Sequence, residues 1–279
     1  MINTRSVPLG PLSFTVDIAG SDDAAPVLLL HGFPETRHMW RHQLDALARA
    51  GYRAIAPDQR GYSSHARPSD PDAYATGLIV GDALALMDAL DAPRFHLIGH
   101  DWGGQIAWLI AANHVHRVKS LAVLSRPHPA AFVRAMKEDA AHAERSRHHR
   151  GFREEGALER MRQAKLKPLR SALENQGVPP ADAEIYIRTL KEPGAIEAAM
   201  NWYRAGTLAS AEVPAVDVAT LYVWGTADAT VGKHAAELTK HHVRGPYHFV
   251  AIESAGHFLV DQFPDRVSAL LVEHLRPVS

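Results

Sequence analysis

The sequence Gly-His-Asp-Trp-Gly surrounds Asp101 and combines a carboxylate with the glycines of a sharp turn. The apolar run 95–98 precedes this segment, and a helix-like run, 105–113, follows it. A strand-to-helix turn strains its central residue and leaves room only for minimal side chains two positions to either side, which Gly99 and Gly103 provide. We therefore predict that Asp101 is a nucleophile at the C-terminal edge of a sheet, rather than simply the N-cap of the helix.

An aspartate at this position favours a different reaction from a serine. A serine must lose a proton to a base before it attacks, whereas a carboxylate with an ordinary pKa of about 4 is already ionised at neutral pH. A carboxylate can displace a leaving group from a saturated carbon and form an ester on the enzyme itself. Water must then hydrolyse that ester, which requires a base and an oxyanion hole. Asp101 therefore predicts a two-step hydrolysis and disfavours an ordinary esterase or lipase.

Two short motifs predict the backbone N–H groups that would stabilise the oxyanion. The motif His-Gly-Phe-Pro at 31–34 directly follows the apolar run 27–30, which precedes the first core helix. The other donor in such a turn is the N–H group of the residue after the nucleophile. We therefore assign the oxyanion hole to Phe33 and Trp102.

The base must be chosen among 18 histidines, and its place in the chain selects His257. This residue comes just after the last apolar run, 249–252. In this fold the base follows both the nucleophile and the acid in chain order. His257 is therefore predicted to activate the water that hydrolyses the ester.

The acid that orients the base should follow an earlier strand. Asp228 comes after the run 221–224 and meets this requirement. Residues 125–129, which follow another apolar run, contain no carboxylate. Asp58 is placed in what looks like a structural loop, and Asp261 lies beyond the base. We therefore predict that Asp228 is the acid.

Alternating apolar runs and amphipathic stretches position these residues and predict an α/β fold with a mostly parallel sheet. The expected strands are 27–30, 53–56, 95–98, 121–124, 221–224 and 249–252, and clear helical stretches are 40–50, 78–90 and 105–114. The alternation stops once, in a charged and helix-like segment that is too long for a connecting loop. The expected organisation is a first core part at 1–126, an inserted helical cap at 127–206 and a second core part at 207–279.

The bulk composition limits the partners. The chain has 279 residues, a formal net charge of −1 and a pI near 7.0, so no long-range field favours nucleic acid or anionic lipid. It has no cysteine, which excludes thiolate nucleophiles and disulfide scaffolds. The start of the sequence lacks the pattern of a signal peptide, and no apolar stretch is long enough to cross a bilayer. A cytoplasmic monomer or homodimer acting on a neutral small molecule is expected.

Nearly the whole chain resembles the α/β-hydrolase-fold epoxide hydrolases, which are related to haloalkane dehalogenases. The resemblance implies that the epoxide opens to a vicinal diol through an ester on Asp101, without a metal or an organic cofactor. It also implies that the substrate contacts Phe33, Pro34, Trp102, Trp202 and Tyr203. The motifs that carry the resemblance are His-Gly-Phe-Pro-Glu at 31–35, Asp-Gln-Arg-Gly-Tyr-Ser at 58–63, Gly-His-Asp-Trp-Gly-Gly at 99–104, Asn-Trp-Tyr-Arg at 201–204 and Gly-His at 256–257.

The same resemblance implies proton donors in the cap. Tyr203 matches the tyrosine that protonates the epoxide oxygen, but the family commonly uses a second tyrosine, and residues 144–153 contain none. His148 aligns with that position, as in a minority of related hydrolases that pair a histidine with the tyrosine, or it belongs to a solvated helix face. Tyr186 is a fallback donor.

Two other functions remain open from the sequence. A haloalkane dehalogenase would use the same nucleophile, acid and base but needs two N–H donors for the leaving halide. Trp102 could be one and Trp202 the other, although one dehalogenase group has asparagine where this chain has Phe33. A non-catalytic ligand sensor would retain the scaffold without reacting. Covalent attachment of a reactive ligand distinguishes an enzyme from a sensor.

Overall fold

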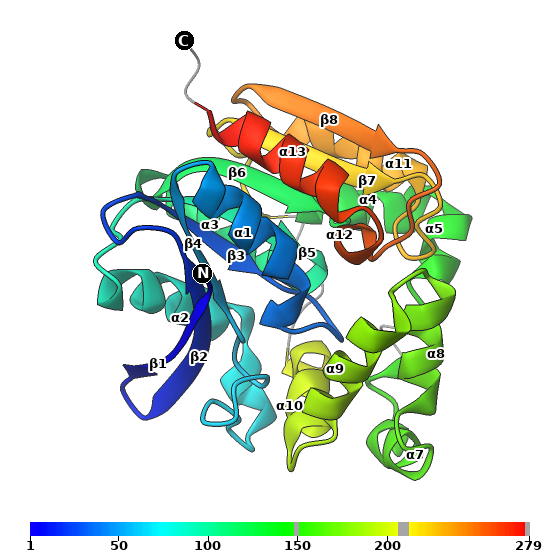
Figure 1. The fold of residues 1–279 in the computed structure, drawn as a ribbon. Helices are drawn as coiled ribbons and strands as arrows, with labels where there is room; N and C mark the ends of the chain where they lie inside the picture. The colour runs from blue at the N-terminus through cyan, green and yellow to red at the C-terminus, as the bar shows by residue number, and fades with distance from the viewer. Residues whose placement is uncertain (148–150, 206–211, 277–279) are drawn as a thin grey trace.

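A mostly parallel sheet runs through the molecule and carries helices on both faces (Figure 1). The computed structural model describes residues 1–147, 151–205 and 212–276. In the described part of the chain, the sheet has eight strands in the order β1-β2-β4-β3-β5-β6-β7-β8. The strands are β1 (Asn3–Leu9), β2 (Leu12–Ala19), β3 (Ala25–Leu30), β4 (Tyr52–Pro57), β5 (Phe95–His100), β6 (Val118–Leu124), β7 (Thr220–Gly225) and β8 (Tyr247–Ile252).

The strands from β4 to β8 pair in parallel, which confirms the predicted fold class. The central strands are buried on both faces, as their continuous apolar runs indicate. The sequence analysis did not predict β1 and β2, which form an antiparallel hairpin at the edge of the sheet. Most side chains of β1 are exposed, so this strand lacks the apolar run that marked the others.

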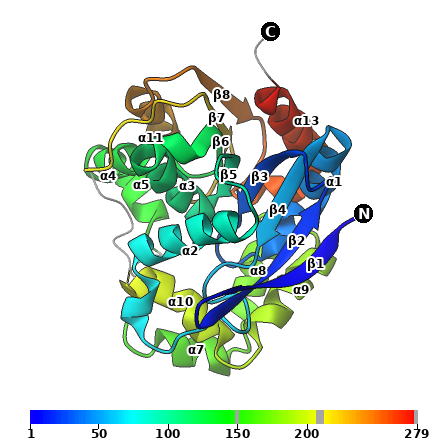
Figure 2. The same cartoon turned by 90° about the vertical axis from the view of Figure 1, so that its left-hand side faces the viewer.

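The helices of the core cover the two faces of the sheet (Figure 2). Helices α1 and α13 pack against each other on one face, whereas α2 and α3 pack together on the other. These helices turn their apolar faces to the sheet, and buried leucines such as Leu44, Leu47 and Leu271 lie on those faces. The bounds are α1 (Arg41–Arg49), α2 (Thr76–Ala89), α3 (Asp101–Asn113), α11 (Lys233–Leu238), α12 (Leu259–Gln262) and α13 (Pro264–Leu275), with the 3-10 helices η1 (Arg37–Trp40), η2 (Pro71–Tyr74), η3 (Val115–Arg117) and η4 (Thr239–His242).

A helical insertion separates β6 from β7. Its described helices are α4 (Pro129–Glu138), α5 (Ala140–Arg145), α7 (Ala157–Gln163), α8 (Lys167–Asn175), α9 (Pro180–Leu190) and α10 (Ala195–Ala205). Helix α4 packs on α11 and η4 of the core, and α5 packs on α4. Helices α7 to α10 form a separate layer that contacts the core at η1 and η2 (Figure 1). None of the helices in the described ranges combines the length and apolar character required to span a bilayer.

His128, at the start of the insertion, is a buried histidine held in its neutral form. Its Nδ1 accepts the N–H group of Ala130 at 3.2 Å, and its Nε2 lies 3.2 Å from the carbonyl oxygen of Pro214. Burial, followed by the charge of the stacked His242 ring, lowers the pKa of His128 to about 3. Below pH 6.5 the unfolded chain therefore binds a proton that the folded chain does not bind, and stability falls as the pH falls.

We predict that this histidine makes folding sensitive to acid. Relative to a His128→Asn variant, which keeps an acceptor for Ala130, the free energy of unfolding should fall by about 1.4 kcal/mol for each pH unit between about pH 6 and about pH 4. Urea unfolding of both proteins at three pH values in this range measures the difference. Parallel pH dependence of the two proteins would contradict the prediction.

Candidate active site

Asp101 lies at the corner where β5 ends and α3 begins. It has a φ angle of 49°, which a residue other than glycine rarely adopts. A Cβ atom on Gly99 would lie 2.4 Å from the carbonyl oxygen of Gly103, and a Cβ atom on Gly103 would lie 2.1 Å from that of Leu30. The two glycines therefore allow the corner to fit against β3. Helix α3 starts at Asp101 itself, and the Asp101 side chain points away to accept the N–H group of Phe33 at 3.0 Å instead of capping the helix.

The structure brings Asp101, His257 and Asp228 together in the order expected from the sequence. The Nε2 atom of His257 is 3.5 Å from Oδ2 of Asp101, and its Nδ1 atom is 3.0 Å from Oδ2 of Asp228. Asp228 also accepts the N–H groups of Thr230 and Val231 at 2.7 and 2.9 Å, which fixes its carboxylate. All three side chains are buried. This arrangement orients the imidazole so that one nitrogen faces the Asp101 carboxylate.

The charges of this set depend on each other. Burial alone would lower the pKa of His257, but the charge of Asp228 and hydrogen bonds to both carboxylates raise it to about 10. Burial would raise the pKa of Asp101, but the hydrogen bond and charge of His257, together with His100 and Arg126, hold it below its usual range. The two carboxylates thus favour the protonated form of His257, and His257 in turn favours the ionised form of Asp101.

A second buried ion pair supports the backbone of the base. His100 Nδ1 lies 2.8 Å from Glu35 Oε2, and both side chains are fully buried. Burial lowers the pKa of His100, but the charge of Glu35 and its hydrogen bond to the ring, together with the charge of Asp101, raise the pKa above its ordinary value. The ring donates through Nε2 to the carbonyl oxygen of His257 at 2.9 Å, and Ser125 Oγ donates to the same oxygen at 2.8 Å. The sequence analysis assigned no role to this pair, although both residues stand in motifs that it quoted.

Arg126 is another buried basic residue near Asp101, and the sequence analysis also assigned it no role. Its guanidinium donates to Gln105 Oε1 at 3.1 and 2.9 Å and lies 5.9 Å from the ring centre of Trp102. Burial lowers the pKa of Arg126, and the charge of Asp101 opposes that effect. The arginine thus helps to keep the Asp101 carboxyl ionised. The sequence could indicate it only as a charged residue directly after a buried strand.

A cavity of about 250 Å³ opens onto Asp101 and His257. Tyr203 reaches it from α10, with its ring 5.3 Å from that of Phe33 and 4.8 Å from that of Phe152. Burial and then the charge of Asp101 raise the pKa of Tyr203 well above its ordinary value, so the phenol stays protonated. The lining is mostly apolar and comprises Phe33, Pro34, Asp101, Arg145, Phe152, Leu169, Ala172, Leu173, Gln176, Tyr203, Ala229, Thr230, His257 and Phe258.

Trp202, Trp102 and Tyr186 were expected to contact the substrate or to donate a proton, but none of their side chains lines this cavity. Trp202 donates its indole N–H group to the carbonyl oxygen of Arg60 at 2.8 Å and is not among the lining residues. Trp102 is likewise not a lining residue, and its ring lies 5.2 Å from the ring of Tyr203. Tyr186, the fallback donor, points instead to Asp261, with its hydroxyl 2.8 Å from Oδ2. His148 lies outside the described residues.

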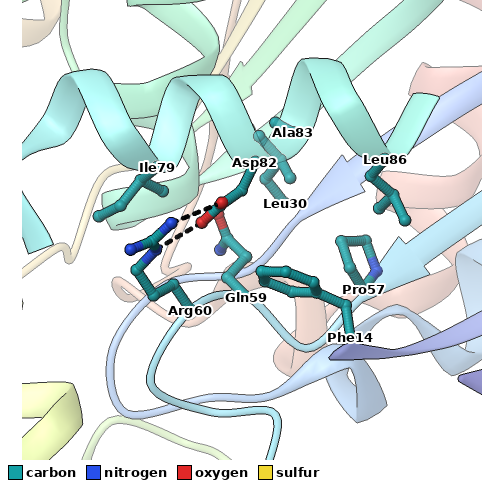
Figure 3. Close-up of a pocket in the computed structure, with 9 residues that line it drawn as sticks. All are labelled: Phe14, Leu30, Pro57, Gln59, Arg60, Ile79, Asp82, Ala83 and Leu86. Atoms are coloured by element: carbon teal, nitrogen blue, oxygen red, sulfur yellow. Dashed lines mark hydrogen bonds and ion pairs between the residues drawn. The ribbon is translucent and has the colours of Figure 1, made fainter. Parts of the chain in front are cut away.

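A second cavity lies beneath α2, away from the nucleophile (Figure 3). Its volume is only about 10 Å³, which is roughly the space of one water molecule. Arg60 and Asp82 meet there through two hydrogen bonds of 2.6 Å, which Figure 3 shows as dashed lines. This cavity cannot hold an organic substrate, and its ion pair has a structural role.

The fold and the site together define a hydrolase of the α/β class with a carboxylate in the position of the nucleophile. The family model for the alpha/beta hydrolase fold matches residues 25–264. Epoxide hydrolase A of Mycobacterium tuberculosis is 32% identical, with 97% of this chain and 96% of that protein covered. The AB hydrolase superfamily protein YfhM of Bacillus subtilis is 31% identical, with 99% of this chain and 96% of that protein covered.

A solved structure from work on novel epoxide hydrolases in metagenomes from hot environments superposes with a TM-score of 0.90. The two chains cover each other completely and share 28% sequence identity. The chain therefore belongs to the α/β-hydrolase-fold epoxide hydrolase family, as the sequence resemblance indicated.

Proposed function

We propose that the protein hydrolyses an epoxide to a vicinal diol through an ester intermediate on Asp101. One observation carries the proposal: the Asp101 carboxylate lies between the Phe33 N–H group and His257, in a cavity that also contains Tyr203. A nucleophile, a base and a neutral phenol thus face the same small volume. The mostly apolar lining suits a neutral epoxide.

In the first step, an Asp101 oxygen attacks an epoxide carbon and the bond from that carbon to the ring oxygen breaks. Tyr203 supplies a proton to the oxygen as its negative charge develops, and the products are an ester and a hydroxyl group. No base is needed, because Asp101 is ionised in the resting site. Protonation by a phenol avoids the release of a free alkoxide, which is a poor leaving group.

The ester then changes the charge of the site. Ester formation removes the negative charge that faces Nε2 of His257 and with it part of the cause of the raised pKa. His257 can then release its proton, which restores the phenol of Tyr203. The neutral imidazole, oriented by Asp228, is now the base for the second step.

In the second step, His257 takes a proton from water, and the hydroxide attacks the ester carbonyl. The N–H groups of Phe33 and Trp102 are the proposed donors to the resulting oxyanion. When the ester bond breaks, His257 returns a proton to the departing oxygen, and the diol is released. The Asp101 carboxyl then ionises and protonates His257, which restores the resting state.

We further propose that the insertion is the cap of the site, with the core at 1–126 and 207–279 and the cap at 127–206. Support comes from Phe152, Leu169, Leu173 and Tyr203, which belong to the insertion and line the cavity. Helix α4 packs on the core, so the layer of α7 to α10 is the part that covers the substrate.

The trapped ester is the direct test. A His257→Gln variant should form the ester and fail to hydrolyse it, because it keeps Asp101 and lacks the base. We would expose it to styrene oxide, 1,2-epoxyhexane, cyclohexene oxide and 1-bromobutane and record intact masses. The expected result is an adduct with the whole mass of an epoxide, located on Asp101 by peptide mapping.

Other outcomes are equally informative. An adduct from 1-bromobutane without its bromine, and none from any epoxide, would favour a haloalkane dehalogenase. The absence of any adduct would overturn the covalent mechanism and favour a binding protein. An Asp101→Asn, His257→Gln double variant is the control for labelling elsewhere.

A further inference from the structure

The loop between β7 and α11 carries the acid and is attached to the base from one side. The N–H group of Ala227 donates to the carbonyl oxygen of Ala255 at 2.9 Å, and that of Ser254 donates to Thr226 Oγ1 at 2.9 Å. These bonds connect the strand end before Asp228 to the segment before His257. The indole N–H group of Trp224 in β7 also holds the loop, because it donates to the carbonyl oxygen of Val231 at 3.0 Å.

Helix α5 of the insertion contacts both ends of the acid loop, residues 228–232. Nδ1 of His142 accepts the N–H group of Gly232 at 3.1 Å. The guanidinium of Arg145 donates to the carbonyl oxygen of Asp228 at 2.6 Å. One turn of α5 thus reaches from one end of the acid loop to the other. Inside this loop, the N–H groups of Thr230 and Val231 bind the Asp228 carboxylate.

His142 is built into the fold as a fixed acceptor. Its side chain is fully buried, and the ring of Phe132 packs edge-on at 5.0 Å. Asp139 Oδ1 accepts the N–H groups of Ala141 and His142 at 2.9 and 3.2 Å, which fixes the start of α5. Because Nδ1 accepts a hydrogen bond, the ring is neutral and carries its proton on Nε2.

The surroundings of His142 keep its imidazole ring neutral over the ordinary pH range. Burial and then the charge of Arg126 lower the pKa of His142 to about 4, and Arg145 acts in the same direction. The carboxylates of Asp139 and Asp228 oppose this effect without overcoming it. Above about pH 4 the ring therefore stays neutral, and Nδ1 stays able to accept the N–H group of Gly232.

We infer that His142 is a positioning residue that holds the acid loop in register with the base through its hydrogen bond to Gly232. The inference rests on the proposed function, because it assigns His142 to the second step. Attack by Asp101 does not need a base, whereas ester hydrolysis needs Asp228 to orient His257. Loosening the loop should therefore slow hydrolysis of the ester and leave its formation unchanged.

The test separates the two steps in a His142→Ala variant. The probe is the member of the epoxide panel that labels His257→Gln fastest. Quenched samples analysed by intact mass give the rate of ester formation and the fraction of enzyme present as ester in steady state. We expect formation to stay within about twofold of the wild type and hydrolysis to fall about tenfold, so that ester accumulates.

Three matched variants make the result specific. His142→Asn places Oδ1 where Nδ1 was and should restore hydrolysis. His128→Ala removes another buried histidine from the same region without touching residues 228–232, and it should lower stability without changing the balance of the two steps. Arg145→Gln, at an exposed position, loosens the other end of the loop and should reproduce a smaller accumulation of ester if His142→Ala does not fold.

An effect of His142→Ala on both steps equally, or on neither, would overturn the inference, and so would the same accumulation in His128→Ala. Amide hydrogen exchange of residues 228–232 is a readout that does not depend on activity. It should become faster in His142→Ala and remain unchanged in His142→Asn. If His257→Gln forms no adduct, the proposed function fails, whereas unchanged exchange in His142→Ala refutes the positioning role alone.

Discussion

Replacement of Asp101 by asparagine should reduce epoxide turnover by at least about 10⁴-fold, because the amide removes the nucleophile. The loss is expected to be chemical and not structural. Asparagine tolerates the positive φ angle at this corner better than other side chains, and its Oδ1 can still accept the Phe33 N–H group. Steady-state turnover and intact mass measure the effect, and no ester should form with any epoxide.

An Asp82→Asn variant is the matched control. It makes the same chemical change at a carboxylate that pairs with Arg60 in the small cavity of Figure 3. It should lower stability somewhat and retain turnover. Turnover of Asp101→Asn close to that of Asp82→Asn would show that the nucleophile is elsewhere.

Replacement of Tyr203 by phenylalanine should slow ester formation by about 10²- to 10⁴-fold, the usual contribution of a positioned acid. The ring contacts with Phe33 and Phe152 would remain, so that only the proton donor is lost. Single-turnover formation of the ester, followed by intact mass, isolates this step. A rate within threefold of that of the protein with Tyr203 would exclude Tyr203 as the donor. A threefold change corresponds to about 0.7 kcal/mol of activation free energy, which is too small for such a role.

The pH dependence of the same step distinguishes Tyr203 from His148. The pKa of Tyr203 is raised well above its ordinary value, so donation by Tyr203 alone gives a rate that is flat from about pH 6 to about pH 9. If His148 donates as well, as we propose from the sequence, ester formation weakens as the pH rises through the histidine pKa. His148→Ala should then remove that dependence. A flat profile, or no effect of this variant, would exclude His148.

The fold was predictable because five of the six predicted strands, β3 to β7, lie inside the sheet and consist mostly of buried apolar residues, and the edge strand β8 also carries an apolar run. Their runs stand out in the sequence, and glycine or aspartate follows most of them where the chain leaves the sheet. The hairpin of β1 and β2 was not predicted, because it lies at the edge of the sheet and the exposed face of β1 allows polar residues. The pattern of apolar residues thus indicates which strands are buried, and it does not indicate which strands pair with each other.

Chain order and short motifs indicated several of the residues that line the cavity, and packing between distant segments determined the rest. Asp101, Asp228 and His257 each follow a strand, and parallel strands end at the same edge of the sheet. Trp202 was expected in the cavity. Of these two neighbouring residues of α10, however, only Tyr203 lines the cavity, whereas the indole of Trp202 donates to Arg60. That difference depends on the rotation of α10 about its axis. The partners of His142 and Arg126 depend on packing between segments far apart in the chain, which no local pattern records.

The position of the insertion has a consequence for how such an enzyme could change its substrate. Asp101 comes before the insertion, Asp228 and His257 come after it, and each of the three follows the end of a strand. The layer of α7 to α10 could therefore be exchanged by recombination or design without rebuilding the reactive groups, provided that a proton donor is retained. Helices α4 and α5 are the exception, since they pack on the core and contact the acid loop. A graft for new substrates should therefore begin after Arg145, not after β6.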